Sequence, residues 1–176
     1  MNETIKTLKT RRSVRNFTDK PVDRELVEQI IDAGLWAPSG IGRQAPIVVA
    51  VTNKELRDRL SAMNAAIMGK DGAEFDPFYG GPVVLVVLSD RSVPTYVYDG
   101  ALVMGNLMNA AEALGVGSIW IHRAKEEFDS DEGKAILAEL GIEGDFEGIG
   151  HCVLGYSDSP APKGAPRKEG RVFWAE

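Results

Sequence analysis

Three arginines lie within five residues near the start of the chain, in the stretch KTRRSVRNF (residues 9–17). Because like charges in close proximity repel one another, Arg11, Arg12 and Arg15 indicate a bound counter-anion in a chain whose formal net charge is -6. Ser13 adds a hydroxyl donor that suits a phosphate oxygen. The alternative is a basic turn that pairs with scattered surface carboxylates.

A second basic cluster lies near the other end of the chain and consists of Lys163, Arg167, Lys168 and Arg171. The two ends of a domain often lie close together, so both clusters could bind one phosphate through charge-assisted hydrogen bonds. This arrangement favours a phosphate-bearing cofactor over two unrelated solvated loops.

The usual motifs of nucleotide and hydrolytic chemistry are absent from the sequence. The stretch GVGS (residues 115–118) follows an expected helix and precedes a strand, which is the reverse of the Rossmann order, and no P-loop or G-x-S-x-G elbow occurs. His122 and His151 are too isolated for a zinc site and fit packing or hydrogen-bonding roles better than catalysis. The lone Cys152 has an apolar setting typical of a small core residue. We therefore assign no catalytic side chain and no metal, and redox chemistry here requires a cofactor.

The composition is that of an ordinary globular protein, with 176 residues of which 44% are hydrophobic and 26% charged. This length predicts one domain over residues 1–176, with residues 157–176 as a C-terminal extension. The acidic balance argues against the broad basic surface that binding to nucleic acid or to an anionic membrane requires. No apolar run has the length of a signal peptide or the roughly 20 residues of a membrane span, so we expect a cytoplasmic protein.

Apolar periodicity and turn residues divide the chain into alternating helices and strands. Helices are expected over residues 2–9, 23–36, 54–68, 99–115 and 130–140. Buried strands are expected over residues 47–52, 83–88, 117–122 and 148–156. Asp23 and Asn53 are suitable N-caps for the second and third helices.

Two segments contain apolar residues that must be shielded from water. The helix over residues 101–114 is apolar nearly all round. Such a helix is buried on every side, either in the core of the domain or between two copies of the chain. The C-terminal extension is rich in proline and basic residues, yet it ends in Phe173 and Trp174, an apolar pair that calls for cover.

Five stretches, in this order and over nearly the whole chain, resemble the nitroreductase family of FMN-dependent oxidoreductases: RRSVRNF, APSGIGRQAP, ALGVGSIWIHRA, GIGHCVLGY and PKGAPRK. The resemblance implies an α+β fold in which helices wrap a mixed, mainly antiparallel sheet. It also implies an intertwined homodimer with FMN at the interface between the subunits.

The resemblance implies which residues hold the cofactor. The residues that match the segments around the FMN phosphate are Arg11, Arg12, Ser13 and Arg15 near the start, and Arg167 and Lys168 in the tail. The turn that reaches the flavin from the partner subunit in this family corresponds to Pro38, Ser39 and Gly40.

The remaining matches lie near the flavin ring. The backbone of Ile121, His122 and Arg123 corresponds to the strand end that faces the ring, where an amide N–H is expected near N5. Asn64, outside the five matching stretches, is a further candidate, for a contact with the ribityl chain.

Two positions depart from the family pattern. Gly42 stands where the family often has asparagine, and no lysine matches the one near the pyrimidine edge of the flavin. Arg123 or Lys70 is the candidate for that missing positive charge.

The implied activity is hydride transfer from NADH or NADPH to flavin N5, and then to a nitroaromatic or quinone-like small molecule at the same place, by a ping-pong mechanism. One alternative is a flavoenzyme of the same fold with another substrate. Another is a non-enzymatic module that binds a phosphorylated ligand through the two basic clusters.

Overall fold

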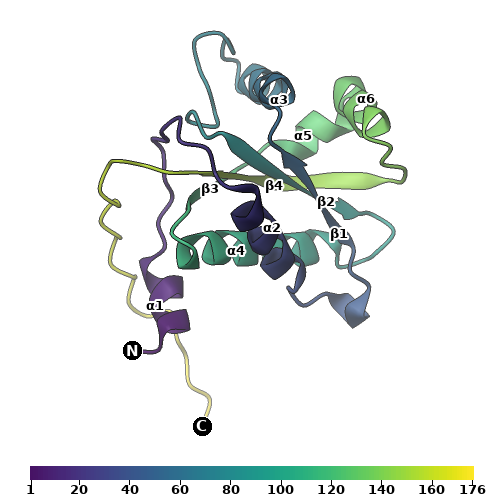
Figure 1. The fold of residues 1–176 in the computed structure, drawn as a ribbon. Coiled ribbons are helices and arrows are strands. Elements are labelled where there is room, and N and C mark those ends of the chain that lie inside the picture. The colour runs from purple at the N-terminus through teal and green to yellow at the C-terminus, as the bar shows by residue number, and fades with distance from the viewer.

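The computed structural model describes residues 1–176 and contains one four-stranded sheet with six α-helices (Figure 1). The elements, in chain order, are α1 (Glu3–Thr10), α2 (Arg24–Leu35), the 3-10 turn η1 (Gly40–Gly42), β1 (Pro46–Val51), α3 (Lys54–Ile67), β2 (Val83–Asp90), α4 (Tyr96–Ala113), β3 (Gly117–Ile121), α5 (Ala124–Asp129), α6 (Asp131–Glu139) and β4 (Phe146–Gly155). Every helix and strand expected from the sequence is present, and the predicted α+β class is confirmed.

The strands are antiparallel throughout and lie in the order β1-β2-β4-β3, so β1 and β3 form the two edges. Figure 1 shows α2 and α4 on one face of the sheet and α3, α5 and α6 on the other. The central strand β2 is buried on both faces, which explains its continuous apolar run VVLVVL. Two hydrophobic clusters, one on each face, form the core.

Of the two predicted N-caps, one makes the expected side-chain hydrogen bond and the other does not. The Asn53 side chain accepts a hydrogen bond from the Leu56 N–H at 2.9 Å and caps α3. Asp23 occupies the N-cap position of α2, but its side chain makes no capping hydrogen bond. The backbone of residue 23 therefore begins the helix without the predicted side-chain contact.

Helix α4 is not covered on every side by this chain. Its inner face packs so closely on α2 that a Cβ at Gly34 would lie 2.4 Å from Leu107 Cδ2. On the outer face Tyr98 is 73% exposed and Leu102 is 47% exposed. Of the two expectations for this apolar helix, complete burial in the core of one chain is therefore excluded, and packing between two copies remains.

Helix α5 is the one α-helix that the sequence patterns did not predict. It contains only six residues, too few to display apolar periodicity. It packs directly on β4, where a Cβ at Gly148 would lie 2.1 Å from the Ala124 carbonyl oxygen. The glycine at residue 148 thus permits the close approach of the helix to the sheet.

Residues 157–176 form no helix or strand and run beside α1 and the segment that follows it (Figure 1). Phe173 and Trp174 are 89% and 84% exposed in this chain. The division into a domain and a C-terminal extension stays a prediction. None of the helices combines the length and the apolar character that crossing a membrane requires.

Candidate functional site

The arginine-rich turn lies along the free edge of β3. The backbone of Ser13 pairs with Ser118 in a short parallel bridge, and the Val14 N–H donates to the Ser118 carbonyl at 3.0 Å. The Nη1 atom of Arg11 is buried and has no hydrogen-bond partner. Such an atom is uncommon, because the loss of its hydration is not compensated. An anion at this turn would supply the missing acceptor.

Arg11 also lies near Cys152, whose ionisation it influences. Burial raises the pKa of the Cys152 thiol to about 12, and the Arg11 charge opposes this increase only in part. Cys152 is fully buried on β4. The thiol therefore stays protonated, as expected of a small core residue.

Arg12 and Arg15 differ in what they contact. Arg12 Nη1 donates to the carbonyls of Lys9 at 2.9 Å and of Arg11 at 2.8 Å, and so it caps the C-terminal end of α1. Arg15 is exposed. Arg11 and Arg15 are therefore available to an anion, whereas Arg12 is already engaged. A phosphate contact from Arg12 stays a prediction.

The C-terminal tail passes over the same turn. A Cβ at Gly164 would lie 2.1 Å from Arg12 Nη2, so the tail backbone contacts the guanidinium directly. Arg167 and Lys168, a few residues later, are exposed. The structure thus brings the two basic segments side by side, but no hydrogen bond or ion pair fixes Arg167 or Lys168 there.

The turn that joins β3 to α5 begins at Ile121, the last residue of β3, and continues through His122 and Arg123. Arg123 has a φ of 78°, in the left-handed region that residues other than glycine seldom adopt. Such outliers gather at functional sites. The His122 ring is exposed and lies 5.7 Å from the Trp120 ring, between centroids. The turn begins about 10 Å along β3 from Ser118, so both predicted segments share one edge strand.

Three fully buried polar side chains, Asn64, Glu127 and His151, lie beneath that turn. The Asn64 amide donates to the His122 carbonyl at 2.8 Å and to the Glu127 carboxylate. Because these contacts hold Asn64 against protein groups, its geometry favours support of the turn over the predicted ribityl contact.

Sequence reasoning missed Glu127 and gave His151 only a general hydrogen-bonding role. His151 Nε2 lies 2.8 Å from Glu127 Oε2. The available signals were weak: an acidic residue four positions after Arg123, and a single polar ring in an apolar strand. Neither identifies a partner until the fold places α5 on β4.

The turn over Pro38, Ser39 and Gly40 lies at the opposite edge of the sheet, where it leads into β1. The Gly40 N–H donates to the buried Asp99 carboxylate at 3.0 Å, and the Thr95 hydroxyl donates to the same carboxylate at 2.9 Å. A Cβ at Gly40 would lie 2.2 Å from Thr95 Oγ1, so the close contact requires glycine. A cavity of about 180 Å³ lies beside Pro38 and Ser39.

The loop after this turn is strained and exposed. Ile41 and Gln44 have φ values of 56° and 51°, and Ile41 is 95% exposed. Gly42 has a φ of 67°. Asparagine is the residue that tolerates this conformation best after glycine, which accounts physically for a glycine where asparagine was expected.

The predicted cofactor segments are thus far apart within one chain. Three inter-strand spacings, roughly 14 Å, separate the β1 edge from the β3 edge. The Thr10 hydroxyl, before the arginine turn, lies 3.2 Å from a Glu112 carboxylate oxygen, whereas the Gly40 N–H donates to Asp99. Along α4 these two anchors lie about 20 Å apart.

Comparison with known proteins identifies the family of this chain. The profile of the nitroreductase family matches residues 8–156. The chain belongs to the nitroreductase family. The resemblance read from its five motifs is therefore confirmed.

Two solved nitroreductases have the same fold over 100% of both chains. One is a nitroreductase with bound FMN from Bacteroides fragilis, with a TM-score of 0.87 and 28% identity. The other is a nitroreductase with bound FMN from Desulfitobacterium hafniense, also with a TM-score of 0.87 and 28% identity.

Curated relatives of this nitroreductase-family chain include the FMN reductase (NAD(P)H) of Bacillus subtilis, 33% identical over 133 residues. That match covers 68% of this chain and 53% of the relative. The NADPH-flavin oxidoreductase of Vibrio harveyi is 35% identical over 130 residues, which cover 69% of this chain and 54% of the relative. The chain thus spans a little over half the length of these relatives.

Proposed function

We propose that this protein is an FMN-dependent oxidoreductase that transfers hydride from NADH or NADPH to a nitroaromatic or quinone-like acceptor. The observation that carries the proposal is the buried Arg11 Nη1 without an acceptor, on the same edge strand as the strained turn at Arg123. The FMN-bound neighbours and the NAD(P)H-dependent relatives support the cofactor and the electron donor.

The residues at the β3 edge fit FMN. Arg11 and Arg15 would bind the phosphate, and the Ser13 hydroxyl would add a donor. The phosphate-side turn pairs with Ser118, and the flavin-facing turn begins at Ile121, a spacing of about 10 Å that an extended ribityl chain can bridge. This order along one strand matches the order of phosphate, ribityl chain and ring in FMN.

When bound, FMN would supply the redox chemistry, accepting hydride from the nicotinamide and donating it to the acceptor at one stacking face. The chain supplies binding and orientation. A backbone N–H in the turn from Ile121 to Arg123 would orient the ring at N5. No side-chain nucleophile takes part.

We further propose a homodimer in which each site draws on both subunits. The Pro38–Gly40 turn lies at the far edge of the sheet from Arg11 and Arg123, so its own chain holds it away from the β3 edge. A two-fold axis would place this turn of the partner subunit against the β3 edge.

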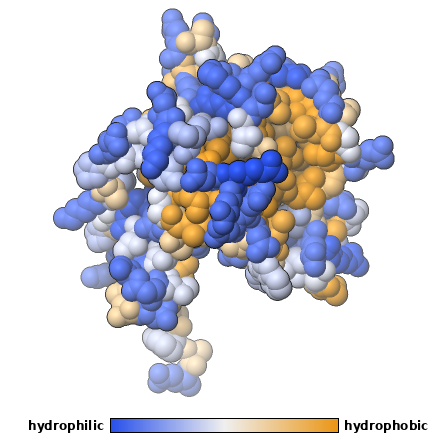
Figure 2. Space-filling model, in the orientation of Figure 1, coloured by the Kyte–Doolittle hydropathy of each residue, from blue (hydrophilic) through white to orange (hydrophobic).

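Exposed apolar side chains support the dimer. They are Trp36 and Ile41 around the turn, Val97, Tyr98 and Leu102 on α4, and Val172, Phe173 and Trp174 in the tail. Figure 2 shows further apolar surface over the edge strand β1. A monomer seldom exposes this much large apolar surface, so we expect a second copy to cover it.

The visible absorption spectrum of the purified protein, before and after addition of FMN, tests the cofactor. Flavin bands that stay with the protein through gel filtration are expected. Steady-state turnover of NADH or NADPH with a nitroaromatic or quinone should give parallel double-reciprocal plots, because donor and acceptor occupy one site in turn.

Two outcomes distinguish the alternatives. A colourless protein that does not retain added FMN would favour a non-enzymatic module for a phosphorylated ligand. A yellow protein that is reduced by NAD(P)H but transfers nothing to nitroaromatics or quinones would favour a flavoenzyme with another substrate.

A further inference from the structure

Asn64 is held in one orientation by three neighbours. Its Nδ2 group faces two acceptors, the His122 carbonyl at 2.8 Å and a Glu127 carboxylate oxygen. Its Oδ1 atom accepts a hydrogen bond from Arg123 Nε at 2.9 Å. Rotation of the amide by half a turn would oppose acceptor to acceptor and donor to donor at all three contacts. The Glu127 carboxylate therefore helps to determine which end of Asn64 meets Arg123.

The same carboxylate also anchors a second support of the turn. Its other oxygen, Oε2, lies 2.8 Å from His151 Nε2, and His151 Nδ1 lies 3.3 Å from the Ile121 carbonyl. Glu127 and His151 have no solvent exposure. Buried polar groups whose hydrogen bonds are all made form a rigid support, because any shift leaves one of them unpaired. The turn from Ile121 to Arg123 is thus fixed from within the core.

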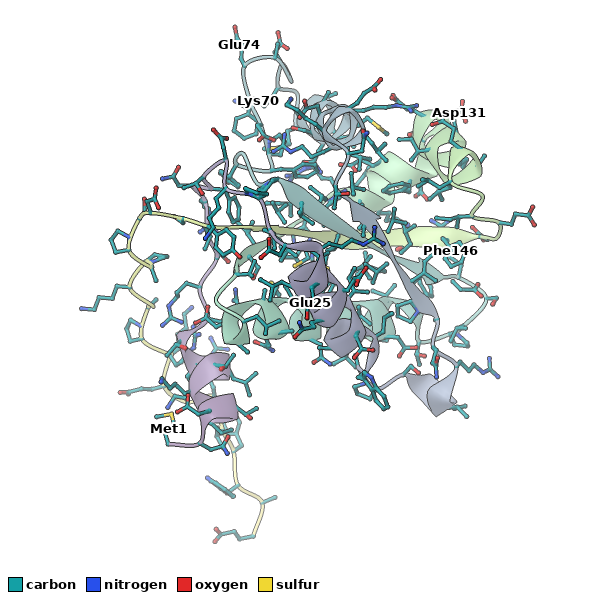
Figure 3. The ribbon with its side chains drawn as sticks, in the orientation of Figure 1. Met1, Glu25, Lys70, Glu74, Asp131 and Phe146 are labelled. Atoms are coloured by element: carbon teal, nitrogen blue, oxygen red, sulfur yellow. The ribbon has the colours of Figure 1, made fainter.

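Arg123 is the charged group that this support presents. Its side chain makes one hydrogen bond, from Nε to Asn64, and no ion pair, so the terminal Nη1 and Nη2 groups remain without a protein partner. Lys125, two residues later, is instead bound to Glu147. Lys70, the other candidate for the missing charge, is exposed in the loop beyond α3, near Glu74 (Figure 3). Only Arg123 combines a fixed position with free donors at the predicted flavin-facing turn.

We propose that Arg123, oriented by Asn64 and through it by Glu127, provides the positive charge beside the flavin, and that Asn64 and Glu127 are positioning residues. The proposal rests on the FMN-dependent function proposed above. A fixed cation stabilises the negative charge that FMN gains on reduction, so the protein should bind reduced FMN more tightly relative to oxidised FMN.

The test is the reduction potential of protein-bound FMN in single and double variants. Arg123→Gly removes the cation and also suits the left-handed backbone at this position, so the fold should be retained. We expect a roughly tenfold loss of preference for reduced FMN, which for a two-electron couple lowers the potential by about 30 mV. Asn64→Leu keeps the cation but removes the hydrogen bond that orients it, so it should give a smaller decrease, and the double variant should not fall below Arg123→Gly, because Asn64 acts through Arg123.

Variants of Glu127 show whether the potential depends on the hydrogen bond from Asn64 or only on the stability of the fold. Glu127→Gln retains an acceptor for Asn64 and should not lower the potential, whereas Glu127→Leu should lower it as Asn64→Leu does. Lys125→Gln, which removes a cation two residues away, is the matched control and should leave the potential unchanged. If a buried variant fails to fold, Arg123→Gly and Arg123→Lys decide: the first should lower the potential, and the second should lower it less.

Two results would overturn the proposal. The first is an unchanged potential in Arg123→Gly with FMN fully bound. The second is an additive decrease in the Asn64→Leu/Arg123→Gly double variant, which would give Asn64 an effect independent of Arg123. Failure of the proposed function itself is distinguishable, because the wild-type protein would then not retain FMN at all.

Discussion

The two edges of the sheet differ in how firmly hydrogen bonds within one chain hold the predicted cofactor segments. At the β3 edge, the turn at Arg123 is supported by buried hydrogen bonds from Asn64 and His151, and Arg11 extends a buried nitrogen that lacks only an acceptor. At the β1 edge, the Gly40 turn is attached through Asp99, and the loop beyond it is strained and exposed.

This difference separates two kinds of functional segment. A binding segment that is preorganised for a cofactor is best held by buried hydrogen bonds. Breaking these bonds costs free energy, so the segment resists movement. A segment that serves a second subunit has to project from the surface, so its own chain can hold it only at its base. We therefore infer that the β3 edge is a preformed binding site and the β1 edge is a contribution to the partner subunit's site.

The largest expected effect is on FMN affinity at the β3 edge. Replacing Arg11 and Arg15 together by alanine removes several charge-assisted hydrogen bonds and should weaken FMN binding by at least about 3 kcal/mol, more than a hundredfold in Kd. Titration of the apoprotein with FMN measures it. The control is Lys6→Ala, which removes a cation from the neighbouring α1 and should change the Kd little.

Riboflavin provides an independent check of the same contact. It lacks the phosphate, so it should bind the wild-type protein much more weakly than FMN does. Equal affinities for riboflavin and FMN, or an unchanged Kd in the double variant, would show that the FMN phosphate does not bind at the arginine turn.

Mixed dimers test whether the two edges serve one site. A variant disabled at Arg11 and Arg15 and another disabled at residues 38–40 should each be nearly inactive. Refolded together in equal amounts, half of the dimers are mixed, and each mixed dimer has one site with both defects and one intact site. Activity should therefore recover to roughly a quarter of the wild-type value, by two-fold symmetry.

Differently tagged subunits would verify that mixed dimers form. If the mixed dimers are present and inactive, both turns belong to the site of the same chain. A monomer in solution would contradict the dimer directly.

A smaller effect is expected at the base of the β1-edge turn. Asp99→Ala leaves the Gly40 N–H without its acceptor and removes the partner of the Thr95 hydroxyl, so the free energy of unfolding should fall by about 1–3 kcal/mol. Urea denaturation measures this. Asp99→Asn keeps an acceptor for Gly40 and should lose less than half as much; equal losses would mean that these hydrogen bonds do not stabilise the turn.

The smallest expected effect is on the pH dependence of stability, and it concerns Asp76, in the loop between α3 and β2. Burial alone would raise the pKa of the Asp76 carboxyl, but hydrogen bonds from Arg57, Ser61 and two backbone N–H groups outweigh it and lower the pKa. Because the pKa is lower in the folded state than in the unfolded state, the stability from this carboxylate is present above about pH 4 and is lost as the pH falls through the folded-state pKa.

Asp76→Asn should therefore reduce the loss of stability between about pH 6 and about pH 3, measured by urea denaturation at each pH. Asp19→Asn, at an exposed position, should leave that difference as in the wild type. An unaltered pH dependence in Asp76→Asn would mean that this carboxylate is not linked to folding.

Much of the fold could be predicted because its signals are local. The runs IVVAVT and VVLVVL are apolar, short and bounded by turn residues, and the structure has β1 and β2 there. The arginine turn was visible for the same reason, because three like charges in an acidic chain are conspicuous without any fold. Helix α5 was missed, because six residues carry no periodic pattern.

The sequence alone determined most of the helices and strands, the family, and the segments that carry charge or turn chemistry, since each of these depends on neighbours along the chain. Only the tertiary structure decided that Arg12 caps α1 while Arg11 remains unpartnered, that Glu127 meets Asn64 and His151, and that the Gly40 turn lies across the sheet from Arg123. The physical reason is that these relations join residues from separate elements. Strand order and helix packing set such distances, and neither is encoded in the spacing of residues along the sequence.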